Sequence, residues 1–355
     1  MTNKTKSLEN LYDLLEISPK ASEEVLRAAH KALMLKHHPD RSGGNENLTQ
    51  QISEAFNVLK DRKTRERYDK NFRDAGGEVV GEYRILSTIA EGGFGRTYKA
   101  KHILTGKLVC IKHCHNLDEF DEEILIEEAQ IMWDLRHHYI PAVHGMLRMP
   151  DRKLALVMSY IKGPTLAQVV ERQIELGKRL DPVHVSWIGE RSLNALRYIH
   201  HEGVVHGDLK PQNIIVEQDG DDNFTHDASV IDFGLSKLKP KAKSGNKGFT
   251  EIFSAPEILA NPDNTILPEA DFYSLGMTMI YALTGDIDCL LRKEVPNDTP
   301  PAFQNFIRKL IVRDPLSRPR WPKNPTEHDL WDEFVKVRQE SFGQRHSGLK
   351  PIPGF

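Results

Sequence analysis

His206-Gly207-Asp208-Leu209-Lys210-Pro211-Gln212-Asn213 decides the fold together with Asp232-Phe233-Gly234, which follows after a hairpin-length gap. The first stretch puts an acid, a lysine and an asparagine on one short loop, and the second adds another acid. Phosphoryl transfer from ATP requires such a set: one carboxylate deprotonates the attacking hydroxyl, a cation neutralises the moving phosphate, and an amide and a second carboxylate hold magnesium. Either stretch alone occurs in ordinary polar loops, but the two in this order predict a phosphotransferase site.

The composition is that of a globular chain of ordinary charge. The 355 residues suggest two or three domains, and the net charge of -3 argues against a nucleic-acid-binding chain. Three cysteines (Cys110, Cys114 and Cys289) are too few for a disulfide framework, which favours a reducing compartment. Met1 to Asn10 has no apolar segment typical of a signal peptide, and the apolar run Leu275 to Leu283 is too short to span a membrane. We therefore expect a cytoplasmic protein with neither a nucleic-acid nor a membrane partner.

Residues 8–72 are predicted to form a small helical domain. Ser22 is a good N-cap, acidic residues follow it in the first turn, and apolar residues then recur at helical spacing. His37-His38-Pro39-Asp40 interrupts this pattern, and a third helix begins at about Leu48. Two antiparallel helices joined by a His-Pro-Asp loop resemble the J domain of DnaJ-type co-chaperones.

The J-domain resemblance implies a contact surface for a DnaK-type heat-shock chaperone. In that family the His-Pro-Asp tripeptide stimulates ATP hydrolysis by the chaperone, and basic residues of the preceding helix meet an acidic surface on it. The residues implied are His38, Pro39, Asp40, Arg27 and Lys31. The residue before the tripeptide is a histidine, where the family usually has tyrosine. The alternative is a helical hairpin in which the tripeptide is only a turn, because tripeptides recur by chance.

Residues 73–82 are predicted to be a linker, and a β-rich region begins after it. Tyr83 to Leu86 and Thr97 to Ala100 are expected to be strands on either side of a glycine-rich turn, and Leu108 to Lys112 is a β-branched strand that ends in lysine. Glycine lets a backbone approach phosphates closely. This pattern resembles the ATP-binding lobe of protein kinases. The resemblance implies that ATP is bound by Ile89, Ala90, Gly92, Gly93, Gly95, Thr97, Lys112, Glu128 and Met158.

The ATP-binding lobe departs from the family pattern at two positions. Ala90 replaces the first glycine of the turn, and Thr97 stands where valine usually covers the adenine. On the predicted helix Glu119 to Leu135, Glu128 matches the acid that braces the strand lysine in this family. Its neighbour Glu127 is the alternative, one residue further round the helix.

From Asp181 the chain is predicted to be mainly helical. Asp181-Pro182 starts a long helix that leads to the catalytic loop, and Asp232 to Glu257 is expected to be the activation segment. Family resemblance pairs Glu257 with Arg318 and makes Asp271 an anchor for the backbone of the catalytic loop. The order of these features resembles the helical lobe of eukaryotic-like serine/threonine kinases.

The predicted architecture is multidomain: a small all-α helical-hairpin J domain followed by a bilobal α+β protein kinase fold. The kinase fold is expected to have a β-rich N-lobe and an α-helical C-lobe. The predicted parts are the J domain (8–72), the linker (73–82), the kinase domain (83–325), and a C-terminal helix and tail (326–355).

The kinase resemblance implies a role for each residue of the opening stretch. Asp208 would orient and deprotonate the substrate hydroxyl, and Lys210 would neutralise the moving phosphoryl group. Asn213 and Asp232 would hold Mg2+ beside ATP. Lys210, two residues after Asp208, favours serine and threonine in protein substrates over tyrosine. Gly207 replaces the arginine that usually grips a phosphate on the activation loop, so we expect activity without loop phosphorylation.

Two further interpretations concern function. The kinase fold could be a largely non-catalytic scaffold or client-binding module of a co-chaperone, although the full set of catalytic residues argues against this.

Cys110 to His115 has the composition of a metal site. On a strand, however, its two cysteines share one face and its two histidines the other, so packing and surface roles are favoured.

Overall fold

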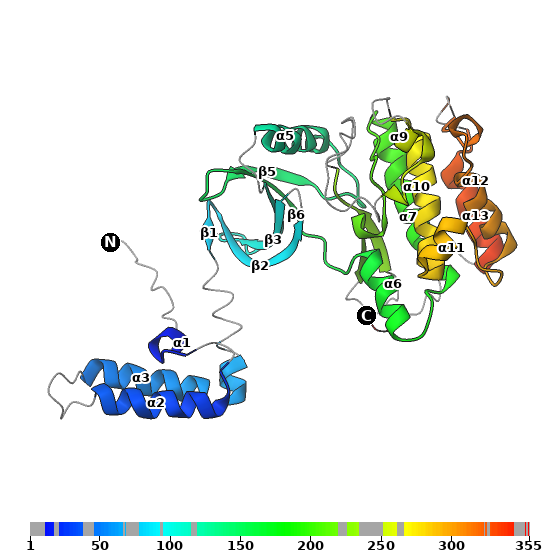
Figure 1. Ribbon diagram of the computed structural model, residues 1–355. Coiled ribbons are helices and arrows are strands. Elements are labelled where there is room, and N and C mark those ends of the chain that lie inside the picture. The colour runs from blue at the N-terminus through cyan, green and yellow to red at the C-terminus, as the bar shows by residue number, and fades with distance from the viewer. Residues whose placement is uncertain are drawn as a thin grey trace. The chain divides into compact units, whose positions relative to one another are not determined.

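The computed structural model divides the chain into two compact units (Figure 1). The first contains Met1–Thr88 and Ala100–Lys107, and the second contains Ile89–Lys99 and Leu108–Phe355. The residues that the structure describes are 11–17, 21–37, 46–66, 68, 78–92, 95–114, 119–218, 226–233, 251–260, 266–322, 324, 327–343, 352 and 354.

A helical hairpin forms the predicted J domain. Its described helices are α1 (Leu11–Leu14), α2 (Glu23–His37) and α3 (Glu46–Leu59). Apolar residues that recur at helical spacing on α2 and α3 face one another, which is why the two helices pair. They bury a core made of Tyr12, Leu15, Leu26, Leu33, Ile52, Ala55, Leu59 and Tyr68.

The chain that follows α3 is tied back to the start of the J domain. The Tyr68 hydroxyl accepts a hydrogen bond of 2.8 Å from the Leu11 N–H. Arg65 donates one of 3.1 Å to the Tyr12 hydroxyl and lies over the ring of the same tyrosine. The predicted chaperone-contact tripeptide at 38–40 lies outside the described residues.

A curled β-sheet and one long helix form the N-lobe of the predicted kinase domain. Among the described residues, six strands lie in the order β1-β2-β3-β4-β6-β5. Helix α5 (Glu119–Trp133) packs on β4, β5 and β6. The strands are β1 (Val79–Val80), β2 (Tyr83–Gly92), β3 (Gly95–His102), β4 (Leu108–Cys114), β5 (Val143–Arg148) and β6 (Leu154–Ser159).

Strand β1 differs from the sequence prediction. It lies within residues 73–82, which we expected to be linker, and pairs with β2 through Val79↔Arg84 and Val80↔Tyr83. Two apolar β-branched residues are enough to extend a sheet when a turn brings them back on a neighbouring strand. The part of the linker that the structure describes is therefore an edge of the sheet.

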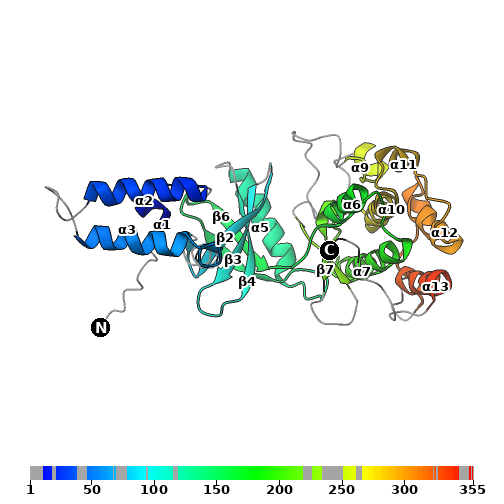
Figure 2. The same ribbon diagram turned by 90° about the horizontal axis from the view of Figure 1, so that it is seen from below.

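The C-lobe is built around one apolar helix, α10 (Pro268–Thr284), which is buried from Glu269 to Leu283. It packs against α6, α7, α11 and α12, and Figure 2 shows it among them. A helix that is apolar all round is expected at the centre of a lobe. The other described elements are α6 (Leu166–Glu175), α7 (Pro182–His201), β7 (Ile214–Gln218), β8 (His226–Val230), α9 (Pro256–Ala260), α11 (Ile287–Arg292), α12 (Pro301–Leu310) and α13 (Leu330–Phe342).

Helix α13 in the predicted C-terminal segment is part of the kinase core. It packs on α7 and α12, and Phe334 is fully buried there. The buried Arg338 donates a hydrogen bond of 3.1 Å to the Ser186 hydroxyl and forms an ion pair with Glu190. A buried ion pair of this kind is lost at a cost of several kcal/mol if one partner is removed. Ile352 in the tail is also buried against the same core.

No helix in the described parts of the chain combines the length and the apolar character needed to cross a bilayer.

Candidate active site

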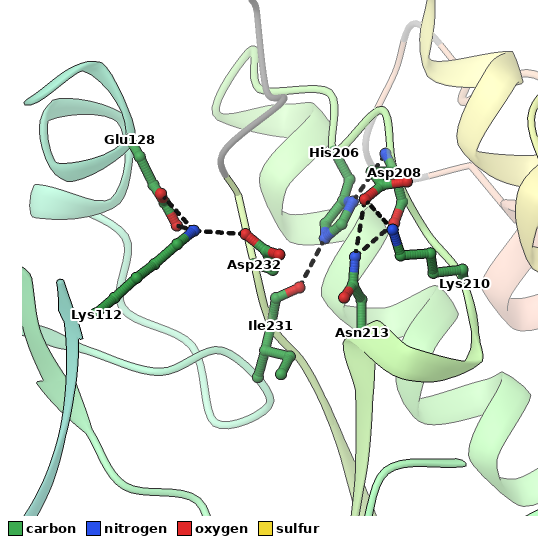
Figure 3. Close-up of polar contacts among 8 residues, drawn as sticks. All are labelled: Lys112, Glu128, His206, Asp208, Lys210, Asn213, Ile231 and Asp232. Atoms are coloured by element: carbon green, nitrogen blue, oxygen red, sulfur yellow. Dashed lines mark hydrogen bonds and ion pairs between the residues drawn. The ribbon is translucent and has the colours of Figure 1, made fainter. Parts of the chain in front are cut away.

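Lys112 on β4 lies between two carboxylates (Figure 3). Its Nζ is 2.9 Å and 2.7 Å from the two oxygens of Glu128 on α5, and 2.7 Å from Oδ1 of Asp232, which follows β8. The Glu128 side chain is 2% exposed, whereas Glu127 is exposed. Helix α5 therefore turns Glu128 toward the lysine, and Glu127, the alternative from the sequence, faces away from it.

Burial and charge set the ionisation of these three groups. Burial alone would lower the pKa of Lys112, but the carboxylates of Asp232 and Glu128 raise it above its usual value. The positive charge of Lys112 lowers the pKa of Asp232 to about 2. Burial raises the pKa of Glu128, and Lys112 opposes that rise. The site thus holds an ammonium group and an ionised Asp232 side by side, as phosphate and metal binding both require.

The catalytic loop places Asp208, Lys210 and Asn213 in one hydrogen-bonded group (Figure 3). Lys210 Nζ is 2.6 Å from Asp208 Oδ2. The Asn213 amide nitrogen donates to the Asp208 carbonyl at 2.8 Å and to its Oδ2 at 3.2 Å. The Asp208 side chain is 11% exposed, and burial raises its pKa while Lys210 acts in the opposite direction. A carboxylate with a raised pKa is a better proton acceptor than an ordinary one.

Asp271 on α10 anchors the backbone of this loop, as the sequence predicted. Its two oxygens accept hydrogen bonds of 2.8 Å from the His206 N–H and the Gly207 N–H. Burial alone would raise the pKa of Asp271, but the hydrogen bonds that it accepts, first that of His200, lower it. The buried carboxylate of Asp271 therefore holds the backbone of the catalytic loop in place.

The backbone at Gly207 explains why glycine suits this position. Its φ is +78°, a left-handed conformation that side chains with a Cβ rarely adopt. A residue with a Cβ would be strained at this position. Asp232 also has a positive φ of +67°, which is uncommon for a residue other than glycine and is typical of strained positions at functional sites.

The glycine-rich turn is fixed closely on the neighbouring strand. At Gly95 the φ is +148°, and a Cβ would lie 2.0 Å from the His113 carbonyl oxygen. Only glycine fits this approach. Ala90 belongs to β2 and Thr97 to β3.

The other residues predicted to bind ATP lie around this turn. Ile89 is half exposed on β2, on which Gly92 also lies, whereas Gly93 is outside the described residues. Met158 is buried on β6 and pairs with Cys110 of β4, two residues before Lys112. Met158 therefore lies on the strand next to the one that carries Lys112.

Asp232 and Asn213 are suited to bind a magnesium ion. The low pKa of Asp232 keeps its carboxylate ionised, and hard divalent cations prefer such oxygen ligands. The Asn213 amide nitrogen faces Asp208, so the amide oxygen points the other way (Figure 3). The donor set that these residues offer, a carboxylate and an amide oxygen, fits magnesium.

The described part of the predicted chaperone surface is exposed. Arg27 on α2 is exposed and pairs with Glu23 one turn earlier, and Lys31 is exposed on the same helix. Exposed basic residues at this spacing present positive charge along one side of α2.

Sequence reasoning did not single out His200 or Trp321 as residues near the catalytic loop. His200 lies at the end of α7 and contacts Asp271 at 2.8 Å, and Trp321 contacts His200 at 2.9 Å. No local pattern in the sequence marks these contacts, because Trp321 lies far along the chain from α7.

Comparison with known proteins agrees with this geometry. Residues 83–329 match the protein kinase domain family, and residues 10–69 match the DnaJ domain family. The first match covers more than half of the chain. The chain therefore belongs to the protein kinase family and carries a J domain ahead of its kinase domain.

Several kinases are similar to this chain. Serine/threonine-protein kinase dst2 of Dictyostelium discoideum is 28% identical over 260 residues, which are 72% of this chain and 21% of the relative. Sperm motility kinase 3A of Mus musculus is 29% identical over 254 residues, 67% of this chain and 47% of the relative. Maternal embryonic leucine zipper kinase of Danio rerio is 27% identical over 274 residues, 74% of this chain and 36% of the relative. The chain spans less than half the length of each of these relatives.

Proposed function

We propose that this protein transfers the γ-phosphate of ATP to serine and threonine hydroxyls of proteins. One observation carries the proposal: Lys112, braced by Glu128, meets Asp232, while Asp208 groups with Lys210 and Asn213. These two groups of contacts match the two parts that a phosphoryl-transfer site needs, and this match supports the proposal. The serine/threonine preference is supported by Lys210 two residues after Asp208 and by the similarity to serine/threonine-protein kinase dst2.

Each side chain has a defined task in the proposed reaction. Asp208 accepts the proton of the substrate hydroxyl, which its raised pKa favours. Lys210 lies beside it and neutralises charge that builds on the transferring phosphoryl group. Lys112 holds the α- and β-phosphates of ATP. Asn213 and Asp232 hold Mg2+, which neutralises phosphate charge when bound.

Gly207 supports activity without phosphorylation of the activation loop. An arginine at this position would grip a loop phosphate, and glycine offers no such cation. The catalytic loop is instead held by Asp271 from within the lobe. The proposed kinase is therefore active as synthesised, and its control is exerted elsewhere.

The J domain is proposed to recruit a DnaK-type chaperone. The family match and the exposed cations Arg27 and Lys31 on α2 support this. His38, Pro39 and Asp40 are proposed to stimulate ATP hydrolysis by the chaperone. The chaperone is then either a substrate of the kinase or delivers substrates to it.

Phosphate transfer by the full chain tests the proposed activity. The protein is incubated with γ-labelled ATP, Mg2+ and a general protein substrate, and the labelled amino acids are identified. We expect label on serine and threonine, and its loss when a chelator removes the metal. Label confined to tyrosine, or transfer that persists in the chelator, would contradict the proposal.

A single substitution in the J domain distinguishes the activities of the two domains. His38→Gln is expected to abolish stimulation of chaperone ATP hydrolysis and to leave phosphorylation of the general substrate intact. Unchanged stimulation by His38→Gln would show that the J-like unit does not act through the tripeptide.

A further inference from the structure

A buried chain of hydrogen bonds leads from Trp321 to the catalytic loop. The Trp321 indole Nε1 lies 2.9 Å from His200 Nδ1, and His200 Nε2 lies 2.8 Å from Asp271 Oδ2. The same Oδ2 accepts the His206 N–H, and Oδ1 accepts the Gly207 N–H, both at 2.8 Å. The His200 side chain is 0% exposed. Water therefore has no access to the imidazole between the indole and the carboxylate.

These contacts determine which ring nitrogen of His200 carries the proton. An indole N–H can only donate, so Nδ1 of His200 must accept. In a neutral imidazole the other nitrogen then carries the hydrogen, and Nε2–H donates to Asp271. The second tautomer would set two N–H groups against each other at Trp321 and a lone pair against the carboxylate of Asp271.

Trp321 is itself fixed by its surroundings. Its ring meets the Phe272 ring edge-on at 5.1 Å, and Phe272 is fully buried beside Asp271 on α10. Three residues earlier, Arg318 forms a bidentate ion pair with Glu257 at the end of the activation segment. The short segment 318–321 therefore contacts both the end of the activation segment, through Arg318, and the support of the catalytic loop, through Trp321.

We propose that Trp321 is a positioning residue for catalysis, because its indole N–H fixes the tautomer through which His200 holds Asp271 and the catalytic loop. The inference rests on the proposed kinase function. Without the indole N–H, Asp271 alone selects the tautomer, so states of His200 that turn an unprotonated nitrogen toward Asp271 become accessible. The carboxylate then loses a donor and the support of the His206–Gly207 backbone loosens. Asp208, the next residue, is displaced from the substrate hydroxyl.

Trp321→Phe removes the N–H and keeps an aromatic ring. We expect kcat to fall by roughly twofold to tenfold, the effect of one hydrogen bond, with KM for ATP unchanged. Trp331→Phe is the matched control. It makes the same change of ring on α13, and among the described residues the Trp331 Nε1 has no hydrogen-bond partner to lose. The control should leave kcat unchanged, and thermal unfolding of both variants shows whether each is folded.

His200→Gln provides the rescue that a packing effect cannot give. A glutamine amide nitrogen takes the place of Nε2 and donates to Asp271 without any choice of tautomer. In the His200→Gln background, Trp321→Phe should therefore cause no further loss of kcat. An equal loss in both backgrounds, or an unchanged kcat for Trp321→Phe alone, would overturn the inference.

The tautomer can also be measured without any activity. Nitrogen-15 spectra of the histidine side chains in the full chain, assigned through the signal lost in His200→Gln, should show His200 protonated at Nε2 alone. A signal from Nδ1–H would overturn the inference. If the wild-type chain transfers no phosphate, the proposed function fails, while the spectra of the wild type and of Trp321→Phe, in which a signal from Nδ1–H should appear, still decide whether Trp321 fixes the tautomer.

Discussion

Replacing Arg318 with methionine is the perturbation whose energy the structure defines most clearly. The Arg318 side chain is 0% exposed, and its guanidinium lies 2.6 Å and 2.8 Å from the two oxygens of Glu257. It also donates at 2.7–3.0 Å to three backbone carbonyls, those of Val312, Arg313 and Glu269. Each N–H of the guanidinium therefore has an oxygen acceptor.

Arg318→Met keeps most of the volume and removes these donors. Loss of one partner of a buried ion pair costs about 3–5 kcal/mol of stability, because the other charge stays behind without compensation. The Glu257 side chain is 29% exposed, so water can solvate it in part. We therefore expect a loss of about 3 kcal/mol in the free energy of unfolding, at the lower end of that range. Glu257→Gln should cost less, about 1–2 kcal/mol, because the amide oxygen still accepts from the arginine.

Urea denaturation followed by tryptophan fluorescence measures this loss in the kinase domain alone. The four tryptophans of the chain all lie between Trp133 and Trp331, and none is in the J domain. Arg292→Met is the matched control, because Arg292 makes a similar ion pair of 2.9 Å with Glu294 on the surface. The control should leave the midpoint unchanged. A shift for Arg318→Met no larger than that of the control would refute the reasoning.

Three further predictions concern the active site. Burial raises the pKa of Asp208, and Asp208 must be ionised to accept a proton, so kcat should fall as the pH decreases through that raised pKa. The fall should begin at a higher pH than for an ordinary carboxyl, and a kcat that stays constant down to the usual carboxyl range would contradict this. Glu128→Gln should lower kcat/KM for ATP by roughly tenfold or more, since the strand lysine loses its buried carboxylate, whereas Glu127→Gln should match wild type; equal effects would contradict the assignment. Gly95→Ala should raise KM for ATP by roughly tenfold, because the added Cβ would lie 2.0 Å from a backbone carbonyl oxygen. Gly145→Ala is the control for backbone strain without a clash, because Gly145 has a similar φ of +150° and nothing within 4 Å of the added Cβ.

The site could be predicted from the sequence where a residue type, its spacing and its element agree. Lys112 on strand β4 and Glu128 on the following helix lie close together because the sheet and the helix pack against each other. The catalytic loop is even more local, since Asp208, Lys210 and Asn213 are within five residues and bond to one another. Such residues can be recognised from the sequence because they lie close together both along the chain and in the site.

The remaining contacts depend on segments that meet only in the folded chain. Two valines in the predicted linker pair with β2, and a two-residue strand is too short to leave a period in the sequence. The sequence predicts a C-terminal helix within residues 326–355, but its buried ion pair joins Arg338 to Glu190 across a separation that no spacing rule covers. Trp321 and His200 meet in the same way. Such pairs follow from the packing of α7, α10 and α13, which the sequence alone does not define.

Phosphate transfer by Asp208→Asn tests the central claim most directly. The substitution keeps the size of the side chain and removes the proton acceptor, while Lys112, Glu128 and Asp232 remain to bind the nucleotide. The assay is label transfer from γ-labelled ATP to serine or threonine of a protein substrate, with ATP binding measured in parallel. The account predicts that transfer falls by roughly 10²- to 10⁴-fold while ATP binding is retained. Transfer by Asp208→Asn at the wild-type rate would contradict it.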